Sequence, residues 1–196
     1  MRVIGLTGGV GSGKSLAAEL LREMTGGELL IADHLGHVAM EKDTSGYRQI
    51  LETFGEDILC PDGRIDREKL GELAFRDGDK LERLNGIVHP IVMAYLEERI
   101  AARRQEEGVM VLESAILFET GCHRLCDEVW YVWVPEQVRL GRLRESRGYS
   151  EEKSQAIMAE QMGEEEFRSR CHKVIRNDGT VERLRGRLEN AIIDCS

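Results

Sequence analysis

Apolar residues along the chain occur in short continuous runs that are separated by longer stretches with helical spacing. The four clear runs are Arg2–Thr7, Leu29–Ala32, Val109–Leu112 and Val129–Val134, and a weaker fifth is Val174–Ile175. Strands buried on both faces lack the alternation of apolar and polar residues, and in α/β folds they alternate with helices. The pattern therefore predicts a three-layer α/β fold, in which helices cover both faces of a parallel five-stranded sheet.

Helices are expected between these runs, where apolar side chains recur every three or four residues or where charged residues dominate. The expected helical stretches are Lys14 to about Met24, Arg64 to Arg83, the segment after His89-Pro90 up to Ile100, Val138 to Arg147, and Glu151 to Met162. Gly148-Tyr149 breaks the last two apart, and Ser150 is a candidate N-cap for the second of them. Because no repeat or linker interrupts the pattern, we expect a single domain over residues 1–196.

A glycine-rich motif separates the first run from the first helix. Residues 8–15 read GGVGSGKS, which matches the phosphate-binding loop (P-loop) pattern G-x-x-x-x-G-K-[ST] between a strand and a helix. Glycines let successive backbone amides turn toward phosphate oxygens, and the helix N-terminus adds a partial charge of roughly +0.5. Lys14 would reach the β- and γ-phosphates, and the Ser15 hydroxyl would bind Mg²⁺. The loop residues expected to bind ATP are Gly9, Val10, Gly11, Ser12, Gly13, Lys14, Ser15 and Leu16.

The loop indicates a bound nucleotide but leaves the reaction open. A GTPase would also carry an N-K-x-D element, which this sequence lacks, and the third run ends in Glu113 where a typical ATPase has an aspartate. Asp33 directly follows the second run, on the edge where open α/β sheets bind ligands. Its carboxylate would orient or deprotonate an attacking hydroxyl, or help to hold Mg²⁺. Capping of a helix that starts at His34 is the alternative role.

An arginine-rich run follows the fourth apolar run. Arg139 and Arg142 are three residues apart, as are Arg144 and Arg147, so each pair can share one helix face. The planar guanidinium suits phosphate clamping, and the break at Gly148 would let the segment close over ATP. A solvated helix face is the alternative interpretation.

Composition and charge narrow the partners. The net charge of −9 argues against a protein that binds nucleic acid through broad phosphate neutralisation. No stretch is long enough to be a membrane span or a signal peptide, since the apolar opening runs straight into glycines. The five cysteines are scattered and odd in number, which favours reduced thiols in the cytoplasm. We expect a monomer or a weak homo-oligomer.

Taken together, the motifs resemble those of the dephospho-CoA kinase family, which catalyses the last step of coenzyme A synthesis. The resemblance runs from Val3 to about Asn190. The matching segments are Ile4–Gly9, Asp33, Phe54-Gly55, Asp62–Leu70, Leu84–Pro90, Leu117–Glu119, Gln161-Met162 and Val174–Gly179. The His89-Pro90 pair and the Asp62–Arg67 run are the more specific of these, because many families share the P-loop.

This resemblance implies that Mg²⁺-ATP phosphorylates the ribose 3′-hydroxyl of dephospho-CoA, giving CoA and ADP. Asp33 would be the general base or orienting group, and Lys14 and a lid arginine, Arg142, would act on the phosphates. Asn177 would lie near the adenine of ATP. The residues expected at the acceptor site are Thr7, Asp33, His89 and Leu117. A helical acceptor-binding insertion is expected at about 34–108 and a helical lid at about 137–165.

The sequence departs from the family pattern at three positions. Ala115 stands where a proline is usual, Phe167 where a lysine often follows the Gln-Met motif, and Arg176 where an acidic residue is common. A cation in place of the missing lysine would come from Arg168 or Arg170. Two other functions stay open from the residues alone, which are another small-molecule or nucleotide P-loop kinase and a nucleotide-binding module without turnover.

Overall fold

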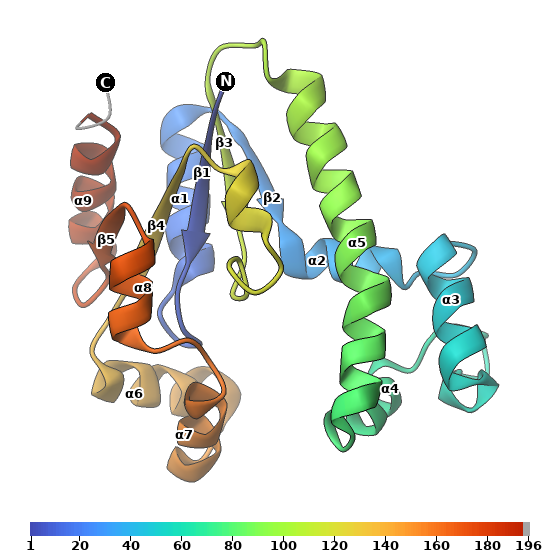
Figure 1. Ribbon diagram of the computed structural model, residues 1–196. Coiled ribbons are helices and arrows are strands. Elements are labelled where there is room, and N and C mark those ends of the chain that lie inside the picture. Colours follow the sequence, from blue (N-terminus) through green and yellow to red (C-terminus); the bar gives the residue numbers. More distant parts are fainter. Residues whose placement is uncertain (194–196) are drawn as a thin grey trace. The chain divides into compact units, whose positions relative to one another are not determined.

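The computed structural model describes residues 1–193 of the chain (Figure 1). Its strands are β1 (Arg2–Thr7), β2 (Glu28–Ile31), β3 (Val109–Glu113), β4 (Glu128–Trp133) and β5 (Lys173–Arg176). Its helices are α1 (Lys14–Thr25), α2 (Ala32–Ala39), α3 (Ser45–Phe54), α4 (Arg67–Phe75), α5 (Gly78–Arg103), α6 (Glu136–Arg147), α7 (Glu151–Ala159), α8 (Glu164–Arg170) and α9 (Val181–Ile193), with 3-10 turns η1 (Glu56–Ile58) and η2 (Cys122–Leu125). Cys195, one of the five cysteines, lies outside the described residues.

The five strands form one sheet in the order β2-β3-β1-β4-β5, and every neighbouring pair is parallel. The predicted parallel five-stranded sheet is therefore confirmed. Strand β1 lies between β3 and β4, with Leu6 opposite both Glu113 and Trp130. The loop that leaves the carboxyl end of β1 consequently starts at the middle of the sheet, the position where open α/β sheets bind ligands.

Helices and loops cover both faces of this sheet, which confirms the three layers. Helices α1 and α9 pack together on one face, over a core that includes Ile4, Trp130 and Leu188. On the other face, the segment that contains η2 crosses closely over β1. A Cβ atom added to Gly5 would lie 2.7 Å from Cys126 Sγ and 3.0 Å from Leu117, so only glycine fits under this crossing.

The chain forms two compact units, which are residues 1–31 with the part from Ala102 onward, and residues 32–101. The first unit contains the sheet. The second unit is helical and has its own small core, formed by Tyr47, Ile50, Ile58, Ile65 and Leu70. The arrangement expected from the sequence, one domain with an insertion and a lid, stays a prediction.

The helix expected from Arg64 to Arg83 is wrong at its start and in its middle. Residues before α4 are extended, and the Asp66 side chain accepts hydrogen bonds from the backbone nitrogens of Glu68 and Lys69, both at 3.1 Å, which starts α4 at Arg67. The chain then breaks, and Asp77 accepts a bond from the nitrogen of Asp79 at 3.1 Å where α5 begins. The Asp66 cap therefore sets the start of α4, and the Asp77 cap divides the expected helix into two.

Other helix boundaries also differ from expectation. Helix α5 starts before His89-Pro90 and passes through Pro90. A proline removes one helical hydrogen bond, but the buried side chains of Val92, Leu96 and Ile100 hold the helix beyond it. Helix α7 ends at Ala159, three residues early. The predicted Ser150 cap is confirmed, because its hydroxyl accepts a bond from the Lys153 nitrogen at 3.2 Å.

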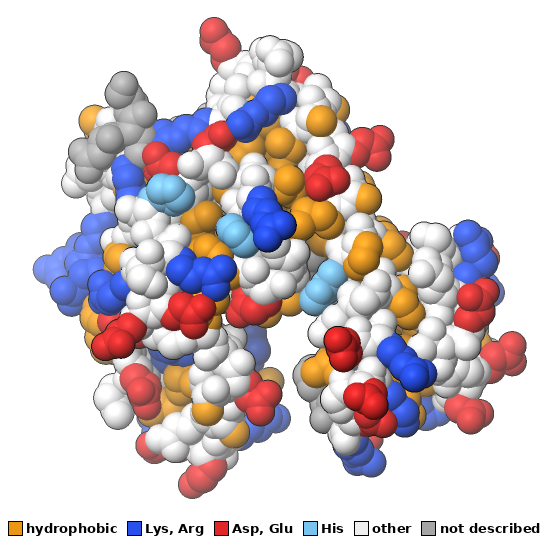
Figure 2. Space-filling model, viewed as in Figure 1, with side chains coloured by type: hydrophobic (Ala, Val, Ile, Leu, Met, Phe, Trp, Pro, Cys, Tyr) orange, Lys and Arg blue, Asp and Glu red, His pale blue; other side chains and the backbone are white. Residues whose placement is uncertain are grey.

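Acidic and basic side chains are interspersed on the face of the molecule shown in Figure 2. They do not gather there into a continuous basic surface, which matches the acidic net charge of −9. Within residues 1–193, none of the helices is both long and apolar enough to cross a bilayer.

The packing of α9 on the sheet gives a stability prediction. Leu188 is 0 % exposed in the sheet core, so Leu188→Ala should lower the free energy of unfolding by about 2–5 kcal/mol. Chemical denaturation monitored by circular dichroism measures the loss. Val181→Ala is the matched control, because Val181 begins the same helix with 45 % of its surface exposed, and it should change stability by less than about 0.5 kcal/mol. An equal effect of both variants would contradict the assigned core.

Candidate active site

The P-loop joins β1 to α1 through backbone conformations that favour glycine. Gly11 and Gly13 have φ angles of 77° and 84°, in the left-handed region. Gly13 occupies the N-cap position of α1 without any side-chain cap, and the first turn of α1 contains no acidic residue. The amides at the start of α1 are therefore left for an external anion.

Side chains from distant segments pack directly on the loop glycines. A Cβ atom on Gly9 would lie 2.5 Å from an Nη atom of Arg139, and a Cβ on Gly13 would collide with the amide nitrogen of Asn177. The glycines thus do two things at once, since they allow the turn and they leave space for these two polar side chains.

The carbonyl groups of the loop accept hydrogen bonds from those same segments. Asn177 Nδ2 donates to the Ser12 carbonyl at 2.7 Å, and Arg139 Nε donates to the Val10 carbonyl at 2.9 Å. The Arg142 guanidinium donates to the carbonyls of Ser12 at 3.2 Å and Asn177 at 2.8 Å. Because the loop carbonyls have these donors, the loop is stabilised without a nucleotide.

Val10 is held on both sides. Its backbone nitrogen donates to Gln161 Oε1 at 2.8 Å, while its carbonyl accepts from Arg139. Sequence reasoning did not assign a role to Gln161, although the Gln161-Met162 pair was one of the family matches. The contact joins residues 151 positions apart, so only the fold reveals it.

Lys14, Ser15 and Leu16 begin α1 at the end of the loop. Lys14 Nζ lies 3.4 Å from the Gly9 carbonyl, so its ammonium group is next to the loop. Ser15 is exposed, and Leu16 has 42 % of its surface exposed, so both are accessible to a ligand. These positions match the chemistry of a triphosphate held by a lysine, a hydroxyl and backbone amides.

Two buried hydroxyl groups near the loop have no hydrogen-bond partner within residues 1–193. They are Thr7 Oγ1, at the carboxyl end of β1, and Ser12 Oγ, within the loop. A buried hydroxyl without a partner costs about 1–3 kcal/mol, so such groups are often partners of a ligand or water.

The remaining predicted residues lie in different surroundings. In the second unit, Asp33 is exposed in the first turn of α2, two residues after β2 ends, and none of the described hydrogen bonds uses its side chain. His89 is half-buried in α5, and burial lowers the pKa of its imidazole, which keeps it neutral at pH 7. In the first unit, Leu117 is 0 % exposed against Gly5. Its side chain has a packing role, and its contact with the acceptor stays a prediction.

At the position where the family often has a lysine, the chain has Phe167, and two arginines lie close by on α8. Phe167 is buried and stacks on Tyr131 at a ring distance of 4.7 Å. Arg168 pairs with Glu164 and Arg170 pairs with Glu166, each four residues earlier on α8. Both expected substitutes for a lysine are therefore engaged elsewhere, and the arginines that lie on the loop are Arg139 and Arg142.

Arg176 also has a local partner. Its guanidinium pairs with Asp178, which Arg187 also contacts at 2.8 Å. Hydrogen bonds from Arg187 and Arg176 lower the pKa of the Asp178 carboxyl to about 2. This cluster fixes the turn directly after Asn177, whose backbone nitrogen donates to the Trp133 carbonyl at 2.8 Å.

Comparison with known proteins points to one family. A family model described as "Dephospho-CoA kinase" matches residues 2–183. A dephospho-CoA kinase of Geobacter sulfurreducens is 40% identical over 190 residues, which cover 96% of each chain. Among solved structures, TT1252 from Thermus thermophilus is similar with a TM-score of 0.83 and 32% identity, over 100% of this chain and 98% of that one. A dephospho-CoA kinase from Campylobacter jejuni has a TM-score of 0.75 at 23% identity, over 100% and 98% of the two chains.

The carbonyl contacts of the loop give a prediction for Asn177. Asn177→Ala removes the shorter of the two hydrogen bonds to the Ser12 carbonyl, which then keeps only the 3.2 Å bond from Arg142. We expect a stability loss of about 0.5–1.5 kcal/mol and a weaker ATP affinity, because the loop is held less firmly in its binding conformation. Thermal unfolding and calorimetric ATP titration measure the two effects. A variant that binds ATP as tightly as the wild type would show that the contact does not organise the loop.

Proposed function

The chain belongs to the dephospho-CoA kinase family, and we propose that its P-loop holds the ATP whose γ-phosphoryl group is transferred to the ribose 3′-hydroxyl of dephospho-CoA. Family membership makes the chain a kinase of coenzyme A biosynthesis. The observation that carries the site assignment is the uncapped start of α1 behind a glycine loop with bonded carbonyls. The comparisons give no support to another kinase activity or to a module without turnover.

We propose that the residues from Gly9 to Leu16 bind the phosphates of ATP. The amides at the start of α1 and the Lys14 ammonium would carry the β- and γ-phosphates, since both act on the charge that moves during transfer. The buried hydroxyls of Thr7 and Ser12 support this proposal, because a bound substrate would supply the partners they lack. Asn177 holds the loop from outside, and its proposed place near adenine rests on the resemblance alone.

The metal of the reaction would be Mg²⁺, which such kinases use with ATP. Within residues 1–193, no group of three His, Cys, Asp or Glu side chains is arranged to hold a metal ion. The exposed Ser15 hydroxyl at the start of α1 fits the proposed ion. Mg²⁺ needs only one or two protein oxygens as ligands when phosphate and water oxygens supply the rest. Bound there, Mg²⁺ would neutralise phosphate charge.

Asp33 is the proposed general base or orienting group for the 3′-hydroxyl. Its exposed carboxylate makes none of the hydrogen bonds described for the chain, so it is available to accept one from a substrate hydroxyl. It follows β2 by only two residues, which limits its distance from the carboxyl end of that strand to about 7 Å. Because the strands are parallel, the carboxyl end of β2 lies on the same side of the sheet as the carboxyl end of β1, where the P-loop starts.

Of the two arginines on the loop, Arg139 is the better placed to act on ATP. Arg142 is the predicted lid arginine, but its guanidinium donates to the Ser12 and Asn177 carbonyls. It would have to break these hydrogen bonds in order to reach a phosphate. Arg139 uses only Nε, for the Val10 carbonyl, and its two Nη atoms lie on Gly9. Lys14 also reaches Gly9. We therefore assign the phosphate cation to Arg139 and loop support to Arg142.

Other properties follow from this function as proposals. We propose that the protein acts in the cytoplasm, because the cysteines in its described part have free thiols. Burial raises the pKa of the Cys126 thiol to about 12, which keeps it protonated and unreactive. ATP and dephospho-CoA are the proposed partners, and a monomer or weak homo-oligomer stays a prediction.

The direct test measures ADP release with Mg²⁺-ATP and one of several acceptors, followed by mass spectrometry of the product. We expect turnover with dephospho-CoA and a product one phosphate heavier. Shikimate and gluconate are suitable control acceptors, because a shikimate kinase and a gluconokinase are among the solved structures of similar fold. Turnover of a control acceptor without turnover of dephospho-CoA would refute the proposed function.

The role of Asp33 gives a kinetic prediction. Asp33→Asn keeps the size of the side chain but removes the basic oxygen, so kcat should fall by roughly 10²–10⁴. The Kd of ATP, measured by calorimetry, should stay within a factor of two or so. A kcat within a few-fold of the wild type would remove Asp33 from this role.

Arg139 can be distinguished from its neighbours on α6. Arg139→Gln should lower kcat by at least about tenfold, equivalent to about 1.4 kcal/mol of transition-state stabilisation, since a cation beside the transferred group is lost. Arg144→Gln is the matched control on the same helix, because Arg144 is exposed, and it should retain wild-type kcat. If Arg139→Gln has wild-type kcat and only Arg142→Gln is slow, the two roles are the reverse of those assigned.

A further inference from the structure

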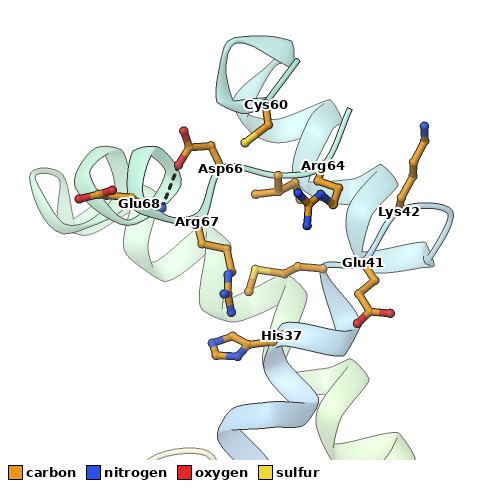
Figure 3. Close-up of a pocket in the computed structure, with 10 residues that line it drawn as sticks. His37, Glu41, Lys42, Cys60, Arg64, Asp66, Arg67 and Glu68 are labelled. Carbon is orange, nitrogen blue, oxygen red and sulfur yellow. Dashed lines mark hydrogen bonds between the residues drawn. The ribbon is translucent and has the colours of Figure 1, made fainter. Parts of the chain in front are cut away.

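The second unit contains a cavity of about 710 Å³ to which the proposed function assigns no ligand. It lies between the C-terminal half of α2 and the segment that leads into α4 (Figure 3). The side chains that matter for its chemistry are His37 and Met40 from the α2 side and Arg64, Ile65 and Arg67 from the other. All of them belong to the same compact unit, residues 32–101.

Two arginine side chains of the lining are directed into this cavity. Figure 3 shows the guanidinium groups of Arg64 and Arg67 directed into the hollow, whereas Lys42 points away from it. Arg67 is exposed and has no ion pair within residues 1–193. Arg64 pairs with Asp62 at 2.7 Å, but its side chain is still 77% exposed and can reach an anion. The cavity therefore offers guanidinium donors to a ligand.

The carboxylates near the cavity do not neutralise Arg67. Asp66 turns toward the start of α4 (Figure 3), where it accepts hydrogen bonds from the backbone nitrogens of Glu68 and Lys69 at 3.1 Å. Glu68 points away from the hollow, and Glu41 and Arg67 lie on opposite sides of it. An anionic ligand that entered would thus meet Arg67 without a competing carboxylate.

His37 lies beside Arg67 and completes the set of donors (Figure 3). Burial first, and then the positive charge of Arg67, lower the pKa of the His37 imidazole, whereas Asp33 acts in the opposite direction. The imidazole is therefore neutral at pH 7 and can donate one hydrogen bond without adding charge. Its position within the electrostatic range of both Arg67 and Asp33 links the cavity to the proposed catalytic carboxylate.

The spacing of Asp33 and His37 on α2 determines which ligand can contact both side chains. Asp33 and His37 are four residues apart, so they share one face of α2 and are separated by about 6 Å along the helix axis. A ligand whose hydroxyl group meets Asp33 would therefore have its neighbouring groups beside His37 and Arg67. An acceptor that fits must carry an anion about one helical turn away from the hydroxyl that reacts.

We infer that this cavity binds the 5′-diphosphate of the acceptor nucleotide, an inference that rests on the proposed function. The ribose of such an acceptor carries the reactive 3′-hydroxyl and the 5′-diphosphate on the same ring, which is the required spacing. Arg67 and Arg64 suit a diphosphate, because a guanidinium donates two parallel hydrogen bonds to phosphate oxygens. Met40 and Ile65 supply an apolar wall for the chain attached to the second phosphate. The cavity would thus select acceptors by the diphosphate.

Kinetics of Arg67→Gln test this site. We expect the KM for dephospho-CoA to rise about tenfold or more, while the KM for ATP and the melting temperature stay unchanged, since Arg67 is exposed and supports no described contact. Arg83→Gln is the matched control, because Arg83 is another exposed arginine of the same unit outside the cavity. Arg67→Lys should recover only part of the affinity, because lysine keeps the charge but loses the paired donors.

A competitor without the diphosphate identifies the group that is recognised. Adenosine, titrated against dephospho-CoA at saturating ATP, should have the same inhibition constant in the wild type and in Arg67→Gln. An unchanged KM for dephospho-CoA in Arg67→Gln, or an equal weakening of adenosine, would overturn the assignment. These results are separable from failure of the function itself, which would appear as wild-type protein that does not phosphorylate dephospho-CoA.

Discussion

The structure depends on the hydrogen bonding of the P-loop backbone. A loop that turns its amides toward a phosphate must turn carbonyls the other way, where protein donors have to meet them. Asn177 and Arg142 meet the Ser12 carbonyl, and Arg139 meets that of Val10. Residues from two distant parts of the chain, α6 and the turn after β5, therefore hold the anion-binding shape before any anion arrives, and the glycines leave room for these contacts.

The two compact units divide the proposed chemistry between them. The unit with the sheet carries the loop, Lys14 and the arginines of α6, which suit the charge of a triphosphate. The helical unit carries Asp33 and the cavity at Arg67, which suit an alcohol with a nearby diphosphate. In the helical unit, Asp66 and Asp77 cap helix starts, whereas in the unit with the sheet α1 begins behind Gly13 without a side-chain cap. Helices α6 and α8 also start without a side-chain cap, but each has a glutamate in its first turn, whereas the first turn of α1 has none and suits an external anion.

The strands and the P-loop were predictable because their signals are local. Continuous apolar runs gave all five strands to within about a residue or two, and the glycine pattern located the loop. The start of α4 was missed even though Asp66 carries a capping signal, because the apolar and charged spacing continues across it. The contacts of Gln161 and Arg139 with Val10 were out of reach, since each joins residues more than 120 positions apart and depends on how α6 and the segment after α7 fold back on the loop. The lid role of Arg142 stays a prediction, and its contacts with the Ser12 and Asn177 carbonyls could not be read from the sequence, because they join distant residues.

The central claim is that the loop is already shaped for phosphate in the free protein. Crystal structures of the protein alone and with Mg²⁺ and a non-hydrolysable ATP analogue would measure this directly. We predict that the backbone of residues 8–15 differs by less than about 1 Å between the two structures and that Asn177 stays bonded to the Ser12 carbonyl in both. A loop that refolds by several ångströms when the nucleotide binds, with that bond broken in either state, would contradict it.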